Sequence, residues 1–359
     1  MSLNDIDHQW MQFACELAQR GLYTTTPNPR VGCVLVKEGQ IVGRGFHEKS
    51  GDAHAEVMAL LEAGDNAKAA TAYVTLEPCN HQGKTGPCSE ALVSAGVKEV
   101  VYGMQDPNPL VAGSGLRRLQ EAGISVRGPV LESQCRALNP GFIKQMEKGL
   151  PWVRCKMAMS LDGRTAMANG ESQWITGEEA RADVQHWRAQ SCAIVTGVGT
   201  VAADDPALTV RSYETPRQPL RVVVDSRLRC EPTAKIFSQP GRTVVATSAF
   251  KRPIDWGVEF WGMPATDGRV DLKALVTRLG KEVQNEILVE AGPSLAGSFL
   301  RLGLVDELIL YFAPKLMGSS ARPLFDLPIQ SMADAMNLNI QSVISLGQDW
   351  RVIASTQTQ

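Results

Sequence analysis

Apolar residues recur at helical spacing at the start of the chain. The positions that share one face of a 3.6-residue helix are Ile6, Trp10, Phe13, Leu17 and Ala18. Asn4 or Asp5 can cap the amino end of this segment, and glycine follows its last apolar position. The pattern predicts an amphipathic helix that ends before Gly21.

The rest of the first half alternates strand-length apolar runs with helical patterns. Strands are predicted over residues 31–36, 41–46, 72–76, 97–103 and 124–127. Helices are predicted from Glu56 to Gly64, over residues 90–93, and through Leu116 and Leu119. The turn at 38–40 joins the first two strands in a hairpin. The alternation predicts an α/β layered domain with a largely parallel sheet.

The second half shows the same alternation without an internal repeat of the first. Strands are predicted from Trp152 onward and over residues 193–197, 220–225, 243–247, 286–290 and 307–313. Helices are predicted over 178–189 and 272–280. Residues 140–149 are the expected passage between the halves, and 141–148 carry a helical pattern of their own. We therefore expect two α/β domains, residues 1–148 and 149–359.

Composition narrows the class of protein. The chain has a formal net charge of -2 and 6% aromatic residues, so no global basic excess favours nucleic acid. Eight cysteines without a secretory leader pattern indicate reduced thiols and metal ligands. The longest apolar stretches are strand-sized, far below a membrane span. We expect a cytoplasmic protein without nucleic-acid or membrane partners, and the apolar Val352-Ile353 leaves room for a homo-oligomer.

One histidine and two cysteines form the clearest chemical signal. His54, Cys79 and Cys88 offer the donors that zinc prefers, and three protein ligands leave one coordination position open. Glu56 follows His54 by two residues, about 200° around a helix. The two side chains can therefore converge only off the helix amino terminus, where exposed amides favour an anionic oxygen. The pattern predicts a catalytic zinc site with Glu56 as its proton carrier.

The cysteine spacing departs from the general pattern of zinc deaminases. That pattern is H-x-E followed by P-C-x-x-C, whereas residues 80–87 separate Cys79 from Cys88 here. A strand pattern precedes Cys79 and a helical pattern follows Cys88, which favours an enlarged loop over a lost site. Two alternatives remain open. In one, the cysteines are buried structural residues. In the other, they belong to a closed structural zinc site with His81 as the fourth ligand.

The second half lacks the G-x-G-x-x-G dinucleotide motif, yet glycine-containing turns follow two of its strands. Residues 290–298 run from a strand into a helix, and residues 197–200 follow another strand. Backbone amides at such turns can hold phosphate groups, although glycine is also ordinary in strand-to-helix turns. Two such turns on one sheet suit a dinucleotide lying across an α/β crevice.

Several polar residues have both a structural and a functional interpretation. Lys156 lies inside an apolar strand, where an ammonium is rare unless it is paired or snorkels to the surface. Asp204, Arg188 and Arg211 can bind a phosphorylated substrate or form surface ion pairs. Asn28 either makes a turn between two prolines or directs its amide at a ring substrate.

Motifs in both halves resemble a single known family. In the first half they are Thr26–Gly32, His54–Glu56, Leu76–His81 and Gly86–Cys88; in the second half they are Met159–Arg164, Gly170–Thr176, Ala203–Pro206 and Val289–Gly292. In this order they resemble the bifunctional deaminase/reductase of riboflavin biosynthesis, over nearly the whole chain and with the long cysteine spacing. The resemblance implies an N-terminal cytidine-deaminase-like α/β/α sandwich and a C-terminal dihydrofolate-reductase-like α/β domain.

The resemblance also implies two successive reactions. The first is zinc-dependent hydrolytic deamination of 2,5-diamino-6-ribosylamino-4(3H)-pyrimidinone 5′-phosphate. The second is NADPH-dependent reduction of the ribosyl group of 5-amino-6-(5-phosphoribosylamino)uracil to a ribityl chain. One Zn²⁺ per chain and NADPH are the implied cofactors, and small pyrimidine nucleotide-like molecules are the implied partners.

Finally, the resemblance implies roles for individual residues. Glu56 and Lys156 are the implied catalytic residues, and zinc is held by His54, Cys79 and Cys88. The implied substrate-binding residues are Asn28, His81 and Lys84 in the first domain and Ser172, Arg188, Leu208, Arg211 and Glu290 in the second. The implied cofactor-binding residues are Ala158, Trp174, Thr200, Asp204, Ser226, Gly292, Pro293, Ser294, Leu295, Ala296, Gly297 and Ser298. Arg227 is a candidate for the 2′-phosphate of NADPH.

Two rival functions make different predictions. A deaminase that edits nucleic acid requires a basic stripe with aromatic residues, which this composition disfavours, and it leaves the second half unexplained. A non-catalytic, zinc-stabilised scaffold would lose the fold of its first domain when zinc is removed. In such a scaffold Glu56→Gln would change no activity.

Overall fold

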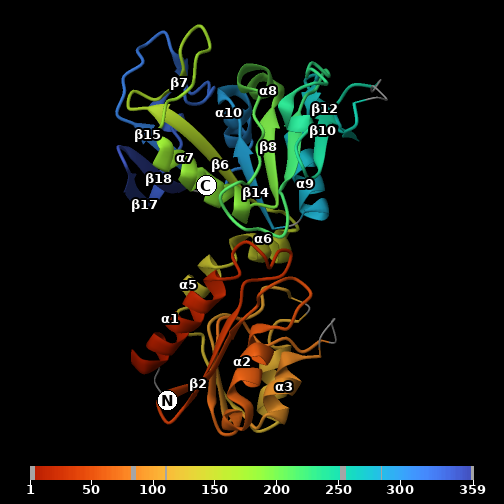
Figure 1. Ribbon diagram of the computed structural model, residues 1–359, viewed down its shortest axis with the longest axis vertical. Helices are drawn as coiled ribbons and strands as arrows, with labels where there is room; N and C mark the ends of the chain where they lie inside the picture. Colours follow the sequence, from red (N-terminus) through yellow and green to blue (C-terminus); the bar gives the residue numbers. More distant parts are fainter. Residues whose placement is uncertain (1–4, 82–85, 110, 251–255, 284, 357–359) are drawn as a thin grey trace. The chain divides into compact units, whose positions relative to one another are not determined.

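The computed structural model describes residues 5–81, 86–109, 111–250, 256–283 and 285–356. Contacts within the chain divide it into two units, Met1–Gly149 and Leu150–Gln359. Both units are built of β-strands and α-helices, as the hydrophobic pattern predicts (Figure 1). Among the described residues, no helix combines the length and the apolar character needed to span a bilayer.

The first unit contains a mixed five-stranded sheet in the order β2-β1-β3-β4-β5. Its strands are β1 (Gly32–Lys37), β2 (Gln40–Phe46), β3 (Thr71–Val74), β4 (Glu99–Tyr102) and β5 (Ser125–Arg127). Its helices are α1 (Asp5–Gln19), α2 (Ala55–Ala63), α3 (Cys88–Ser94), α4 (Ser114–Glu121), α5 (Glu132–Ala137) and α6 (Pro140–Lys148), with a 3-10 helix at Gly64–Ala67.

The prediction of a largely parallel sheet is wrong for this unit. β1 pairs antiparallel with both β2 and β3, and only the β3–β4 and β4–β5 pairings are parallel. The reason is the tight hairpin after β1, which reverses the chain. The connection through α2 then places β3 on the other side of β1, with the same strand direction as β2.

Glycines allow helices to pack closely on both faces of this sheet. A Cβ on Gly32 would lie 2.0 Å from the carbonyl oxygen of Ala14 in α1, and one on Gly45 would lie 2.4 Å from that of Ala55 in α2. Gly45 pairs with Cys33, the neighbour of Gly32, so the two glycines face opposite sides of the sheet. Therefore α1 and α2 cover opposite faces, and the amino end of α2 packs directly on β2.

The second unit contains a nine-stranded sheet in the order β11-β10-β9-β8-β14-β6-β15-β18-β17. The strands are β6 (Trp152–Ser160), β8 (Ala193–Gly197), β9 (Leu220–Val224), β10 (Thr243–Thr247), β11 (Glu259–Gly262), β14 (Glu286–Glu290), β15 (Glu307–Ala313), β17 (Leu338–Leu346) and β18 (Asp349–Thr356). Neighbours from β11 to β15 are parallel, and β18 and β17 add antiparallel strands at one edge. Two small sheets pair β7 (Arg164–Ala166) with β16 (Arg322–Pro323) and β12 (Ala265–Thr266) with β13 (Arg269–Val270).

Helices cover both faces of the large sheet (Figure 1). α7 (Glu178–Gln190) and α8 (Val198–Asp204) pack on one face, where Trp187 joins a core with Ile194 and Tyr311. α9 (Leu272–Glu282) and α10 (Pro293–Arg301) pack on the other, where Leu275 and Phe299 are fully buried. Short 3-10 helices lie at Lys235–Phe237 and Met332–Asp334. The parallel strands bring their carboxyl ends to one edge of the sheet, and this edge carries the pocket described below.

Candidate functional site

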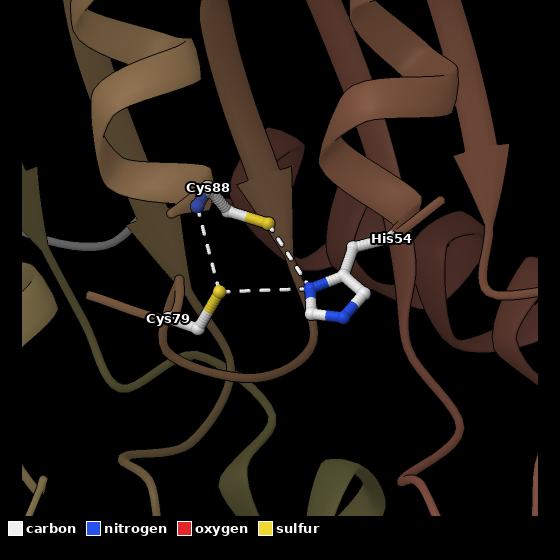
Figure 2. Close-up of side chains that lie close together, drawn as sticks. All are labelled: His54, Cys79 and Cys88. Carbon is white, nitrogen blue, oxygen red and sulfur yellow. Dashed lines mark hydrogen bonds between the residues drawn. The ribbon is translucent and has the colours of Figure 1, made fainter. Parts of the chain in front are cut away.

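Three side chains converge in the first unit (Figure 2). His54 is the N-cap of α2, Cys88 is the first residue of α3, and Cys79 follows β3 in the intervening segment. His54 Nδ1 lies 3.2 Å from Cys88 Sγ and 3.5 Å from Cys79 Sγ. The Cys88 backbone N–H donates to Cys79 Sγ at 3.4 Å. The three ligand atoms all lie within 4.8 Å of one another, close enough to bind one ion.

The donor set fits zinc, which binds imidazole nitrogen and thiolate sulfur in tetrahedral sites. A hydrogen bond from Cys88 is the main cause that lowers the pKa of Cys79 to about 4, and the same bond and burial raise the pKa of Cys88. One thiolate is therefore present at neutral pH, and a cation can replace the proton that the sulfurs share. Within the described residues, no fourth histidine, cysteine or carboxylate joins the group, so His81 is not part of it. Three ligands suit a catalytic rather than a closed site.

Glu56 lies buried in the first turn of α2, beside these ligands. Burial raises the pKa of its carboxyl to about 7, and the charge of Cys79 adds to the effect. The side chain also hydrogen-bonds with Cys88. A carboxyl that titrates near neutrality can both take and return a proton, which suits general acid–base chemistry.

A histidine that the sequence pattern did not single out holds Asn28. His47 is buried just after β2, with Nδ1 3.1 Å from the Ala53 carbonyl oxygen and Nε2 3.1 Å from Asn28 Nδ2. The carbonyl requires the proton on Nδ1, so Nε2 accepts from the Asn28 amide. Burial lowers the pKa of His47, which keeps the ring neutral. The Asn28 amide nitrogen is thereby engaged, and its oxygen is left to receive a donor from a ring.

We expect His47→Ala to impair deamination without loss of metal. One neutral hydrogen bond is worth about 1 kcal/mol, so kcat/KM for ammonia release should fall about fivefold. Steady-state kinetics and metal analysis on the same sample measure both quantities. His8→Ala, an exposed position on α1, is the matched control. An unchanged kcat/KM would show that Asn28 does not depend on His47.

The two residues predicted to bind the substrate phosphate are less well defined. His81 is exposed, and burial raises the pKa of the neighbouring Asp106 although His81 opposes this effect. The charge of Cys79 also acts on Asp106, so His81 and Cys79 both lie near this carboxyl. Lys84 lies outside the described residues.

A cavity of about 1180 Å³ opens at the carboxyl ends of β6, β8, β9 and β14 in the second unit. This edge of a parallel sheet is where ligands bind in open α/β folds. Most of the residues predicted for the second unit line it. They are Lys156, Ala158, Ser172, Trp174, Arg188, Thr200, Asp204, Leu208, Arg211, Ser226, Glu290, Gly292, Pro293, Ser294, Leu295 and Ser298. Arg227 lines it as well.

Two predicted cofactor residues do not line this cavity. Ala296 is fully buried in the core beneath α10, and a Cβ on Gly297 would lie 2.4 Å from the carbonyl oxygen of Asp326. Both residues lie in α10. Position 296 faces the sheet, and position 297 faces the backbone at Asp326. Their role is in packing α10, and the residues before them face the cavity.

A buried charge group lies at the base of the cavity. Arg188 Nε and Nη2 donate to the two carboxylate oxygens of Glu290 at 2.6 and 3.0 Å, and Lys156 Nζ lies 3.8 Å from Glu290 Oε2. Burial lowers the pKa of Lys156 although Glu290 opposes this effect. Burial disfavours the charge of Glu290, but the two cations outweigh it and lower its pKa. Arg188 thus orients Glu290, and Lys156 lies beside this pair as a second cation.

Further contacts fix the walls of the cavity. Ser172 Oγ donates to Asp204 Oδ1 at 3.0 Å, and the Gly292 N–H donates to Thr200 Oγ1 at 3.1 Å. The second bond ties together the two glycine-containing turns that the sequence singled out. Both turns therefore belong to a single site.

The sequence pattern also missed the residues that hold Trp174. Trp174 is 64% exposed. The Arg181 guanidinium carbon lies over the indole, 4.7 Å from the ring centroid, and Lys315 Nζ donates to the Trp174 backbone carbonyl oxygen at 2.8 Å. A cation above an indole is a favourable contact. No local sequence signal identifies Lys315, because it lies 141 positions from Trp174.

Comparisons with known proteins agree with this geometry. Residues 151–352 match the family described as RibD C-terminal domain, and residues 4–104 match the cytidine and deoxycytidylate deaminase zinc-binding region. The riboflavin biosynthesis protein RibD of Escherichia coli is 52% identical over 357 residues, covering 96% of this chain and 97% of that protein. The chain belongs to the RibD family.

Solved RibD structures extend the comparison to the fold. An Acinetobacter baumannii RibD structure has a TM-score of 0.92 at 49% identity, covering 98% of this chain and 99% of that one. A Thermotoga maritima structure, described as a diaminohydroxyphosphoribosylaminopyrimidine deaminase/5-amino-6-(5-phosphoribosylamino)uracil reductase, has a TM-score of 0.90 at 32% identity, with the same coverage.

Membership of the RibD family confirms the predicted family and fold class. The chain has an N-terminal cytidine-deaminase-like domain and a C-terminal dihydrofolate-reductase-like domain. It is a bifunctional enzyme of riboflavin biosynthesis, a deaminase and an NADPH-dependent reductase, and its cofactors are zinc and NADPH. Its substrates are small pyrimidine nucleotide-like molecules.

Proposed function

We propose that residues 1–148 deaminate 2,5-diamino-6-ribosylamino-4(3H)-pyrimidinone 5′-phosphate and that residues 149–359 reduce the product, 5-amino-6-(5-phosphoribosylamino)uracil. The observation that carries this proposal is the presence of two separate constellations on one chain. One is the group of His54, Cys79 and Cys88 beside Glu56, and the other is the cavity with Lys156 at its base. The reactions named for the Thermotoga maritima relative are the two that such sites require.

In the deaminase site the protein residues divide the work between metal binding and proton transfer. His54, Cys79 and Cys88 would hold zinc, which supplies a Lewis acid that makes water nucleophilic near neutral pH. Glu56 takes one proton from the attacking water and gives it to a ring nitrogen, and it then takes the proton of the added hydroxyl and gives it to the departing amine. The carbon–nitrogen bond to the exocyclic amine then breaks, ammonia leaves and a carbonyl remains. The Asn28 oxygen orients the ring, and His81 and Lys84 bind the substrate phosphate.

In the reductase site the protein residues bind and orient both reactants. NADPH supplies the hydride that the sugar C1 accepts once the ring has opened to an imine or aldehyde. Lys156 gives a proton to the atom that gains negative charge, and Glu290, held by Arg188, keeps the Lys156 ammonium in place. The other substrate contacts come from Ser172, Leu208 and Arg211. The cofactor contacts come from Ala158, Trp174, Thr200, Asp204 and Ser226, from Gly292 to Leu295 and from Ser298, with Arg227 at the 2′-phosphate.

We also propose that the enzyme acts in the cytoplasm as a homo-oligomer. All eight cysteines are free thiols, and Cys15 Sγ lies 3.6 Å from Cys135 Sγ without a disulfide, which supports a reducing compartment. Exposed Ile340 on β17 and Trp350 on β18 support an interface at this edge of the sheet.

A coupled assay with zinc removal tests the two-site assignment. The diaminopyrimidinone phosphate is added to the full-length protein with NADPH, and ammonia release and NADPH oxidation are recorded together. We expect a strong chelator to stop ammonia release while NADPH oxidation continues with the pre-deaminated substrate, because only the first site needs the metal. Added zinc should restore ammonia release. If the intact chain releases ammonia but never consumes NADPH, the second unit acts on a different substrate.

A further inference from the structure

We propose that Glu77 is a positioning residue of the deaminase, which holds Cys79 ready for the metal by capping helix α4. The proposal rests on the metal-binding role of His54, Cys79 and Cys88 proposed above. Glu77 lies two residues before Cys79, and its carboxylate is buried with 4% of the residue exposed. A buried carboxylate is costly unless donors satisfy it, so its partners define its role.

Two of the three backbone amides that Glu77 accepts from lie at the amino end of α4, and the third belongs to Asp106 in the preceding segment. Oε1 accepts the N–H of Gly115 at 2.9 Å, and Oε2 accepts those of Gly113 at 2.9 Å and Asp106 at 3.2 Å. Gly113 is the N-cap of α4, and no side chain caps this helix from within its own first turn. Glu77 therefore satisfies amides that the helix leaves unpaired, and its negative charge lies at the positive end of the helix dipole.

Gly115 brings the same helix end against the residue that precedes Cys79. A Cβ at Gly115 would lie 1.9 Å from the carbonyl oxygen of Pro78, so only glycine permits this approach. On its other side Cys79 is held by α3, because the Ser89 N–H donates to the Cys79 carbonyl oxygen at 3.1 Å. The Cys79 backbone is thus fixed between the amino ends of two helices, and Glu77 makes the α4 side of this clamp.

A ligand that is already in place binds metal more tightly than one that must be ordered first. Groups that orient metal ligands typically contribute about 10–100-fold to metal affinity. Glu77→Gln keeps the size of the side chain but replaces one oxygen by an NH₂ group, which cannot accept from an amide. Either the bond to Gly115 or the bonds to Gly113 and Asp106 are then lost.

The test measures zinc affinity in the full-length protein. Apo Glu77→Gln and apo wild type are titrated with zinc in competition with a chromophoric chelator, and circular dichroism follows the fold. We expect the variant to bind zinc about tenfold more weakly. Its ammonia release should be low at limiting zinc and should recover in excess zinc. Reductase activity on the same sample should match the wild type.

Glu90→Gln is the matched control, since Glu90 is a half-exposed residue of α3 that pairs with Arg118 of α4 at 2.6 Å. This control should keep wild-type zinc affinity, because exposed pairs contribute little. Equal weakening in Glu90→Gln would overturn the proposal, since general loosening of the helix junction would then explain both results. Wild-type zinc affinity in folded Glu77→Gln would also overturn it. If Glu77→Gln does not fold, Glu77→Asp is titrated instead, and wild-type zinc affinity in that variant would overturn the proposal equally.

His54→Ala separates failure of this proposal from failure of the metal site itself. If His54→Ala keeps its zinc and its ammonia release, the proposed metal site is wrong and Glu77 has no such role. If His54→Ala loses zinc and Glu77→Gln does not, the metal site stands and the clamp alone is wrong.

Discussion

Glu56→Gln is expected to abolish ammonia release while NADPH oxidation with the pre-deaminated substrate continues at the wild-type rate. Glutamine fills the same buried space at the start of α2 but cannot take a proton from water or return one. General acid–base catalysis contributes about 10²–10⁴-fold. Because one carboxyl serves both the attack of water and the departure of ammonia, we expect kcat for deamination to fall by at least about 10³-fold.

The measurement is ammonia release at saturating substrate, with zinc content determined on the same sample. Zinc should stay bound, because Glu56 is outside the group of ligand atoms. Glu62→Gln is the matched control on the same helix, at an exposed position that pairs with Arg44. Full activity in Glu56→Gln would favour the zinc-stabilised scaffold, in which the metal supports the fold and no proton is carried.

Much of the fold follows from local patterns in the sequence. The strands β8, β10, β14 and β15 begin and end at the predicted residues, because buried parallel strands consist of continuous apolar runs. β17 was missed because its alternation of apolar and polar residues is short, being interrupted by a register shift after Ile340, and nearly all its side chains are exposed. The hairpin of β1 and β2 was predicted, whereas the antiparallel pairing of β1 with β3 was missed because it depends on the path of the chain, which periodicity does not encode.

The residues of the two sites also differ in whether local sequence patterns or only long-range contacts identify them. His54 and Glu56 are two residues apart at the start of one helix, so their spacing alone predicts where they converge. The group formed by Lys156, Arg188 and Glu290 joins residues more than a hundred positions apart, from β6, α7 and β14. The sequence predicts that Arg188 binds the substrate, and the structure adds the hydrogen bonds from its guanidinium to Glu290. The contacts of Glu77 were equally invisible, because its partners are backbone amides, which carry no sequence signature. His47 was missed because its contact with Asn28 spans 19 positions.

The charge group in the reductase cavity leads to the second large expected effect. Lys156→Ala should reduce NADPH oxidation about 10²–10⁴-fold and leave ammonia release unchanged. Glu290 remains held by both nitrogens of Arg188, so the loss reflects the missing proton donor rather than a collapsed site. Lysine can act in this way because burial lowers its pKa. The loss should therefore fall on kcat, while NADPH binding, followed by fluorescence titration, should stay near the wild-type value.

Lys156→Arg separates a proton donor from a simple positive charge. Arginine keeps the charge beside Glu290 but does not release its proton in proteins, so we expect this variant to be nearly as inactive as Lys156→Ala. Lys281→Ala, at an exposed position on α9, is the control and should keep both activities. If Lys156→Arg recovers most of the reductase activity, the site needs only a cation there, and the proton must come from another group or from water.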